Sequence, residues 1–470
     1  MPRHSLPFVL IALFTPAALA QTPVDVEALA QAAVERLQAY LQVDTTNPPG
    51  NELRGVQFLG EILDREGIDY STAEAAPGRA NLWARLGGGT EPAIVLLHHI
   101  DVVPADAGYW DADPLSGEIR EGYLYGRGAL DTKSLGIMQL QAFIALHRAR
   151  KPLRRPVILM ATADEEAGGA LGAEWMIANR ADVFADATLL LNEGGTGLDY
   201  GEQRLVNVEV TQKVPLWLRL TTEGDPGHGS RPRVDSAVTR LIAVLDRISH
   251  YPFEPRLIPA VQSYFEARGS AGVGPFPERL ADIANGIEDR GFLQALKFAD
   301  PTLAALTQDT CAITRLEGSN KVNVIPPQAS AELDCRLLPD QDPAGFIDLL
   351  RSVAGEPTLE IETLLSFTPA VSTTDSHLYQ AIETVSARHF PNAPVVPAVS
   401  PGFTDSHYFR DLGVVAYGYS PIMLDLDEAA TIHGNNERIS VENVRRGTQM
   451  MFELLELLVY PQPAGADGAP

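Results

Sequence analysis

The sequence predicts an α/β fold: a mostly parallel sheet with helices on both faces, interrupted by a smaller inserted domain. Apolar runs of strand length alternate with amphipathic runs of helix length in residues 21–211 and again in 374–460. Between these regions the order becomes strand-helix-strand-strand-helix-strand, the ferredoxin-like order, with a helical insertion. The length of 470 residues also suits two domains.

Each predicted element follows from a local pattern. In the larger domain, helical spacing of apolar residues predicts helices over 30–43, 53–67, 135–146 and 170–177, and short apolar runs predict buried strands over 93–97, 157–161 and 187–191. In the inserted domain we expect strands over 214–222, 311–316, 329–338 and 359–364, helices over 234–248 and 346–353, and a mainly helical stretch over 251–309. The larger domain then comprises 21–211 and 366–462, the inserted domain 212–365, and a disordered tail 463–470.

The first twenty residues predict an export signal. Arg3 opens the chain, an apolar run follows over 6–19, and Ala18-Leu19-Ala20 forms a small-residue cleavage site. The competing interpretation is a membrane anchor, but the run is too short to span a bilayer and lacks a basic flank. We therefore expect cleavage after Ala20 and a soluble protein that is exported, either periplasmic or secreted.

Charge and cysteine content exclude some classes of partner. The formal net charge is −25, which disfavours nucleic acid and anionic membranes and favours cations. Two cysteines are too few for a disulfide scaffold. Cys311 and Cys335 lie at equal distances from Asn323 in a predicted strand pair, so either a disulfide or two buried free thiols fits the pattern.

Imidazole and carboxylate side chains follow the predicted buried strands. In an extended segment His99 and Asp101 share a face, and His98 points away. The other positions are Asp131 after a Gly-rich turn, the adjacent Glu165 and Glu166, Glu193 after a third strand, and His433 far downstream. Taken singly, each has an ordinary structural explanation: a core histidine, a helix N-cap or a solvated acidic loop. Sites in such sheets form beyond the carboxyl ends of the strands, where these residues gather.

The charges of this cluster fit two divalent cations. Asp131, Glu166 and Glu193 supply three negative charges, and a bridging hydroxide would balance the four positive charges of two ions. Imidazole and carboxylate ligands without thiolates suit Zn²⁺, with Co²⁺ or Mn²⁺ as substitutes.

The ordered motifs resemble one metallopeptidase family across nearly all of the mature chain. The motifs are HHIDVVP, GRGALDTK, ADEEAGG, NEGG, GHGSRP, NVIPP, TDSHYF and IHGNNE. They are similar to those of the co-catalytic di-zinc aminoacylases and carboxypeptidases, which include carboxypeptidase S, glutamate carboxypeptidase, acetylornithine deacetylase and succinyl-diaminopimelate desuccinylase. The sequence around Trp110 and the ending IHGNNERIS look nearest to the carboxypeptidase S-like secreted branch.

The resemblance implies a role for each candidate residue. His99 and Glu193 would hold one ion, Glu166 and His433 the other, and Asp131 both, with a cis peptide bond after it. Asp101 would orient His99, Glu165 would act as general base and acid, and the inserted domain would be a lid that also dimerises. His228 of the lid would stabilise the oxyanion, and Asn323 and Arg336 would hold a substrate carboxylate. His407 replaces an arginine found in many relatives and is the next candidate for that carboxylate.

We therefore expect an exported amidohydrolase or exopeptidase that cleaves the amide bond next to a free carboxylate. The substrate would be a peptide C-terminus, a dipeptide or an N-acyl amino acid. The alternative is a secreted binding protein on the same scaffold without catalysis. A serine hydrolase is excluded because the chain has no G-x-S-x-G motif.

Overall fold

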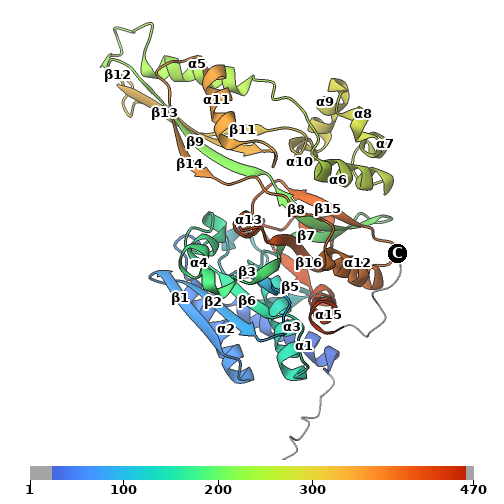
Figure 1. Ribbon diagram of the computed structural model, residues 1–470. Coiled ribbons are helices and arrows are strands. Elements are labelled where there is room, and N and C mark those ends of the chain that lie inside the picture. The colour runs from blue at the N-terminus through green and yellow to red at the C-terminus, as the bar shows by residue number, and fades with distance from the viewer. Residues whose placement is uncertain (1–23, 462–470) are drawn as a thin grey trace, which may run out of the picture.

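The computed structural model describes residues 24–461, which form two bodies joined by extended strands (Figure 1). The predicted signal peptide and the predicted tail at 463–470 lie outside these residues. No helix among residues 24–461 is long and apolar enough to cross a membrane.

An eight-stranded mixed sheet forms the centre of the larger body (Figure 1). Its strands, in spatial order, are β1 (Tyr70–Ala76), β2 (Arg79–Leu86), β6 (Val157–Thr162), β3 (Ala93–His99), β7 (Ala187–Asp199), β16 (Val415–Asp425), β8 (Arg204–Gln212) and β15 (Val395–Ser400). The pairs β3–β6, β3–β7, β7–β16 and β8–β15 are parallel, whereas β1, β2 and β8 add antiparallel pairings. Every side chain of β3 and β6 is buried, because both sheet faces are covered.

Helices cover both faces of this sheet, as the sequence predicts. One apolar core lies beneath α1 (Val26–Leu41), α2 (Glu52–Glu66), α3 (Lys133–Ala149), α12 (His377–His389) and α15 (Val441–Val459). The core on the other face lies beneath α4 (Ala173–Asn179) and α13 (Ser406–Asp411). Strand alternation divides the central strands between the two cores: Ile94 and Leu96 face the first, and Val95 and Leu97 face the second.

The smaller body has the predicted ferredoxin-like order. Its antiparallel sheet runs β11 (Thr310–Glu317), β13 (Gln328–Leu337), β9 (Val214–Glu223) and β14 (Glu360–Ser366), and α5 (Ala237–Ser249) and α11 (Pro343–Ala354) pack on one face. A two-stranded ladder of β10 (Gly227–His228) and β12 (Val324–Ile325) extends from it. In Figure 1, β12 lies at the end of this body farthest from the larger sheet.

The helical insertion packs against the larger body rather than the sheet of the smaller one. It contains α6 (Pro259–Ser270), α7 (Pro277–Ala281), α8 (Ile283–Gly286), α9 (Arg290–Ala299) and α10 (Pro301–Ala305). Val261 and Phe265 of α6 share a core with Val396 and Val399 of β15, and Figure 1 shows α6 beside β15. The predicted inserted domain of 212–365 is thus contiguous in sequence but divided in its packing.

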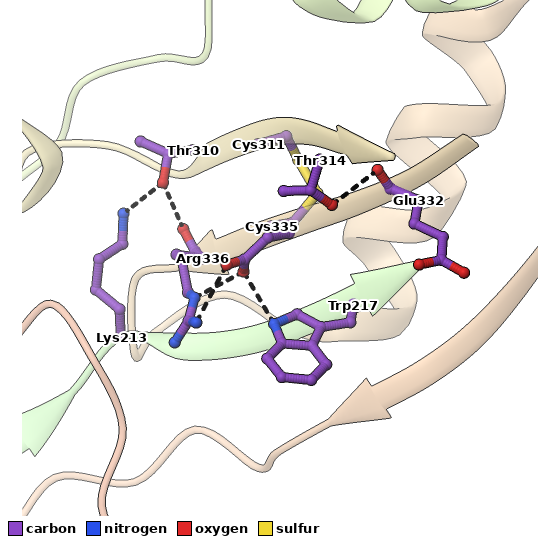
Figure 2. The surroundings of a disulfide bond; sticks show 9 residues. Lys213, Trp217, Thr310, Cys311, Thr314, Glu332, Cys335 and Arg336 are labelled. Carbon is purple, nitrogen blue, oxygen red and sulfur yellow. Dashed lines mark hydrogen bonds and ion pairs between the residues drawn. A yellow bond between two sulfur atoms is a disulfide. The ribbon is translucent and has the colours of Figure 1, made fainter. Parts of the chain in front are cut away.

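Cys311 and Cys335 form a disulfide between β11 and β13 (Figure 2). The two residues are direct register partners in this antiparallel ladder. This settles the alternative that the sequence left open, and the described chain has no free cysteine.

Candidate metal centre

Two triads of candidate metal ligands share the carboxylate of Asp131. In the first, His99 Nε2 lies 2.9 Å from Asp131 Oδ1 and 3.4 Å from Glu193 Oε1. In the second, His433 Nε2 lies 3.0 Å from Asp131 Oδ2 and 3.2 Å from each carboxylate oxygen of Glu166. The structure thus brings together the five residues that the sequence predicted as ligands, in the predicted two groups.

These side chains meet at the carboxyl ends of the parallel strands. His99 ends β3, Glu166 follows β6, Glu193 lies beyond the part of β7 that pairs with β3, Asp131 precedes α3, and His433 lies between α14 (Leu426–Ala429) and β17 (Arg438–Ser440). His98 points to the opposite face, where its Nδ1 lies 3.3 Å from Gln139 of α3. The peptide bond between Asp131 and Thr132 is cis, as the resemblance implied.

The cluster concentrates negative charge away from water. Burial, together with the charge of Asp131, raises the pKa of Glu193 to about 7. Burial also raises the pKa of Asp131, but hydrogen bonds with His433 and His99 outweigh it and hold that pKa below its usual value. Hydrogen bonds with Asp131 and Glu166 raise the pKa of His433 to about 10. Carboxylates forced together in this way are stabilised by a cation between them.

The donor set fits two divalent cations. Each triad offers one imidazole nitrogen and carboxylate oxygens, with ligand atoms within 4.8 Å of one another. Three protein ligands with a further position left for water or substrate are typical of catalytic rather than structural zinc sites.

Glu165 lies beside the first triad with a shifted pKa. It is 7% exposed, and its Oε2 is 4.0 Å from His99 Nε2. Burial and the charge of Glu193 raise its pKa well above the usual value. A carboxylate with a raised pKa can both accept and return a proton near neutral pH.

Asp101 holds the Glu165–Glu166 turn more directly than it holds His99. The ring Nδ1 of His99 lies 2.9 Å from the backbone carbonyl of Asp101 but 3.6 Å from its carboxylate. The carboxylate instead accepts the backbone N–H groups of Glu165 and Glu166, both at 3.2 Å. The residue therefore positions three members of the site, and its backbone makes the closer contact with His99.

The structure does not bring His228 or Asn323 to the metal centre within one chain. His228 lies on β10, is exposed, and contacts Ser230 through its Nδ1 at 2.8 Å. The exposed Asn323 precedes β12, at the far end of the smaller body (Figure 1). That Asn323 and Arg336 jointly hold one carboxylate stays a prediction, and within one chain the two residues lie toward opposite ends of β13. The stretch of β13 from Gln328 to Arg336 alone spans about 26 Å at ~3.3 Å per residue.

Arg336 lies at the other end of β13, close to the larger body. Its Nε and Nη2 donate to Asp334 at 2.7 and 3.2 Å, so the simple surface pairing considered from the sequence does form. Trp217 donates to the same Asp334 carboxylate at 3.0 Å. The guanidinium also lies 5.5 Å from the ring centre of Phe403, and its Nη1 is buried without a hydrogen-bond partner among the described residues.

His407 does not fit the role of a charged carboxylate partner. Burial lowers its pKa to about 3, so the ring is neutral at physiological pH. The ring stacks on Phe367 at 3.5 Å between centres, and its Nδ1 contacts the Thr404 carbonyl at 2.9 Å. A neutral, stacked ring does not supply the charge of an arginine, so the role of His407 as the next candidate for the substrate carboxylate stays a prediction.

The sequence did not predict the polar network that contacts Asp101 and Asp164. Asn47 donates to Asp101 at 2.8 Å and to Asp164 at 3.2 Å. Arg79 binds Glu52 through two hydrogen bonds of 2.7 and 2.8 Å and also contacts Asp164. These residues sit in segments without periodic signal, and the only cue in the sequence is the pair of prolines after Asn47.

The fold and the shared aspartate agree with the metal-dependent hydrolases that the motifs resemble. The family model described as Peptidase family M20/M25/M40 matches residues 95–457, and the chain belongs to this metal-dependent family. It is 33% identical over 376 residues to the N-fatty-acyl-amino acid synthase/hydrolase PM20D1 of Xenopus tropicalis, a match that covers 77% of this chain and 72% of that protein. It is 28% identical over 434 residues to aminoacylase-1 of Homo sapiens, covering 91% and 95%.

Solved structures share the fold. An M20 family metallo-carboxypeptidase from Sulfolobus solfataricus aligns with a TM-score of 0.72 at 21% identity, over 91% of this chain and 99% of that chain. Human carnosine dipeptidase 1 aligns with a TM-score of 0.61 at 17% identity, over 92% and 98%. These structures support the fold, and the family match together with the relatives in sequence makes the protein an M20-family amidohydrolase or peptidase.

Proposed function

We propose that the protein is an exported di-zinc amidohydrolase that releases amino acids from N-acyl amino acids. The observation that carries the proposal is the pair of ligand triads that share Asp131. The substrate class is supported by relatives named for N-fatty-acyl-amino acids and by the aminoacylases. Peptides with a free C-terminus are the competing substrates.

The residues of the site have separate tasks in this reaction. His99, Asp131 and Glu193 would hold one ion, and Asp131, Glu166 and His433 the other. Bound divalent cations supply Lewis-acid polarisation of the scissile carbonyl and activation of a water. Glu165 would take the proton of the attacking water and return it to the leaving nitrogen. Asp101 would keep the Glu165–Glu166 turn in place through its two backbone contacts.

Arg336 is our candidate for the substrate carboxylate. It lies against Phe403, and its buried Nη1 has no hydrogen-bond partner within residues 24–461. A guanidinium fork binds a carboxylate through two parallel hydrogen bonds. We retain the proposed oxyanion role of His228. Because β10 lies far from the centre in this chain, that role requires either closure of the lid or a homodimer in which a second copy delivers the residue.

A product analysis tests the proposal. The mature chain (21–470) is loaded with Zn²⁺, incubated with mixed N-acyl amino acids and dipeptides, and the products are identified by mass. We expect free amino acids from the N-acyl substrates and none from Glu165→Gln. Cleavage of dipeptides alone would replace the deacylase assignment by a peptidase. Binding of two ions without any turnover would support the alternative of a binding protein.

Export is tested separately. Full-length protein is expressed in a bacterium, cell fractions are separated, and the N-terminus of the product is sequenced. We expect Gln21 as the first residue in the exported fraction. An intact N-terminus in the cytosolic fraction would remove export from the proposal.

A further inference from the structure

We propose that the buried Arg127–Glu437 ion pair is a clamp that sets the positions of Asp131 and His433 and thereby controls occupancy of the second ion position. The clamp rests on the proposed di-metal site. Neither member belongs to the two ligand triads, so both would act as positioning residues.

Glu437 holds the backbone that leads into Asp131. Its side chain is fully buried, and Oε1 accepts the backbone N–H groups of Leu130 at 2.7 Å and Asp131 at 3.1 Å. Its Oε2 accepts the N–H of Gly128 at 3.1 Å and Arg127 Nη1 at 2.7 Å. Only an ionised carboxylate can accept four N–H donors in this way. A glutamine would turn an NH₂ group toward at least one of them.

The Gly128 turn has little freedom to adapt if Glu437 changes. Its φ is +88°, and a Cβ atom added there would lie 2.7 Å from Val102 Cγ1. The turn at Gly128 therefore lies close to Val102, the residue that follows Asp101. A shift of the turn would move Asp131 relative to the first triad as well as the second.

Arg127 extends the same contact to His433. Its Nη2 donates to the carbonyls of His433 at 3.4 Å and Gly434 at 2.9 Å. His433 has a φ of +57°, a left-handed conformation that a residue with a side chain adopts only when its surroundings hold it. Arg127 is 3% exposed, and its guanidinium lies 5.3 Å from the ring centre of Trp110.

Arg127 and Glu437 contact different ligand segments, so their variants should affect the two ions differently. Glu437 holds the segment before Asp131, and Arg127 contacts the carbonyl groups of His433 and Gly434. The second triad takes Asp131 and His433 from the two clamped segments, whereas the first takes only Asp131. Loss of Arg127 should therefore affect mainly the second ion, and loss of Glu437 should affect both.

The experiment measures metal binding without substrate. Metal-free mature protein is titrated with Zn²⁺ by calorimetry and with Co²⁺ by visible absorption. We expect two ions in the wild type. Arg127→Gln should weaken one ion by about 10–100-fold, the usual effect of removing a partner of a ligand, and Glu437→Gln should weaken both. Excess Zn²⁺ should restore activity to Arg127→Gln.

Glu66→Gln is the matched control. Glu66 accepts hydrogen bonds from Arg36 at 2.9 Å and Arg148 at 2.7 Å and has no contact with the ligand segments. It should lose stability without losing metal affinity. If Glu437→Gln does not fold, Arg127→Lys replaces it: the charge opposite Glu437 remains, but the forked reach to Gly434 is lost, and the second ion should weaken.

The outcomes separate the clamp from the proposed function. A wild type that binds fewer than two ions would overturn the di-metal proposal. A wild type that binds two ions, with Arg127 and Glu437 variants that bind them like Glu66→Gln, would overturn the clamp alone.

Discussion

His433 Nε2 lies 3.0 Å from Asp131 Oδ2. A residue near the carboxyl end of the chain therefore joins Asp131 and Glu166, which come much earlier in the sequence, in one triad. The other oxygen of Asp131 lies 2.9 Å from His99 Nε2. One carboxylate therefore links both ion positions, and a change at one position is expected to be felt at the other.

Removing either imidazole should remove one ion and nearly all activity. In His99→Ala the first triad keeps only carboxylates, and in His433→Ala the second does. Metal content of dialysed protein, measured by mass spectrometry of the elements, should fall from two ions to one. Two ions per chain in both variants would contradict the ligand assignment.

Glu165→Gln and Glu166→Gln should fail in different ways. Glu165→Gln removes the proton acceptor while sparing the triads, so both ions should remain and turnover should fall by about 10²–10⁴-fold. Glu166→Gln removes a member of the second triad, so the affinity for one ion should fall first. Metal analysis and kcat on the same preparations distinguish them, and the reverse pattern would mean that the two roles are exchanged.

Metal binding should release protons at neutral pH. In the metal-free protein Asp131 and Glu166 raise the pKa of His433 to about 10, so its ring is protonated at pH 7. An imidazole must be neutral to bind a metal ion, so the apparent affinity for Zn²⁺ should rise as the pH increases from 6 toward 10. Calorimetry in buffers with different ionisation enthalpies counts the released protons. We expect fewer in His433→Ala, and a heat independent of buffer would contradict the expectation.

The role of Arg336 can be isolated by a cycle of two proteins and two substrates. An amide in place of the substrate carboxylate should lower kcat/KM of the wild type by roughly 10²-fold or more, because the guanidinium then faces a neutral group. Arg336→Ala should lose a similar factor on the acid and little further on the amide. Equal hydrolysis of acid and amide by the wild type would exclude carboxylate recognition. Since His407 is neutral and stacked, His407→Gln should not show this coupling.

Loss of the disulfide should destabilise the pair of strands β11 and β13. The bond closes a loop between residues with a sequence separation of 24, for which the chain-entropy model gives about 3–4 kcal/mol. The double change of Cys311 and Cys335 to alanine should lower the denaturant midpoint by a corresponding amount while metal content is kept. A thiol assay on denatured, unreduced protein provides the control, and two reactive thiols there would show that the bond does not form.

The sequence predicted part of the ligand cluster from local signals and the rest from the order of the motifs. His99 ends the buried strand β3 and Glu166 follows the buried strand β6, and the carboxyl ends of such strands meet at one edge. Glu437 and Asn47 carried no such signal, because their partners are distant in sequence and only the folded chain brings them close. Strand β1 was not predicted because small and polar residues such as Ser71, Thr72 and Glu74 occupy its exposed positions.

The positions of the lid residues could not be predicted for a different reason. A motif fixes the neighbours of Asn323 along the chain, but the distance from Asn323 to Arg336 depends on how far β13 extends. The helical stretch over 251–309 was assigned to the lid by its place in the chain, whereas Val261 and Phe265 select the surface of β15. Apolar contacts between segments distant in sequence decide such cases, and local periodicity does not contain them.

The packing of α6 on β15 determines which fragments of the protein can be soluble on their own. A fragment cut at 212–365 would carry α6 to α10 without their partner, with the side chains of Val261 and Phe265 facing solvent. The remaining fragments would expose Val396 and Val399 in turn. A soluble lid therefore requires excision of the helices and a short bridge from α5 to β11, and a soluble catalytic body requires the helices to be retained. If the smaller sheet moves relative to the larger one, α6 should stay with β15, and the bending should fall where β9, β11 and β14 approach the larger body.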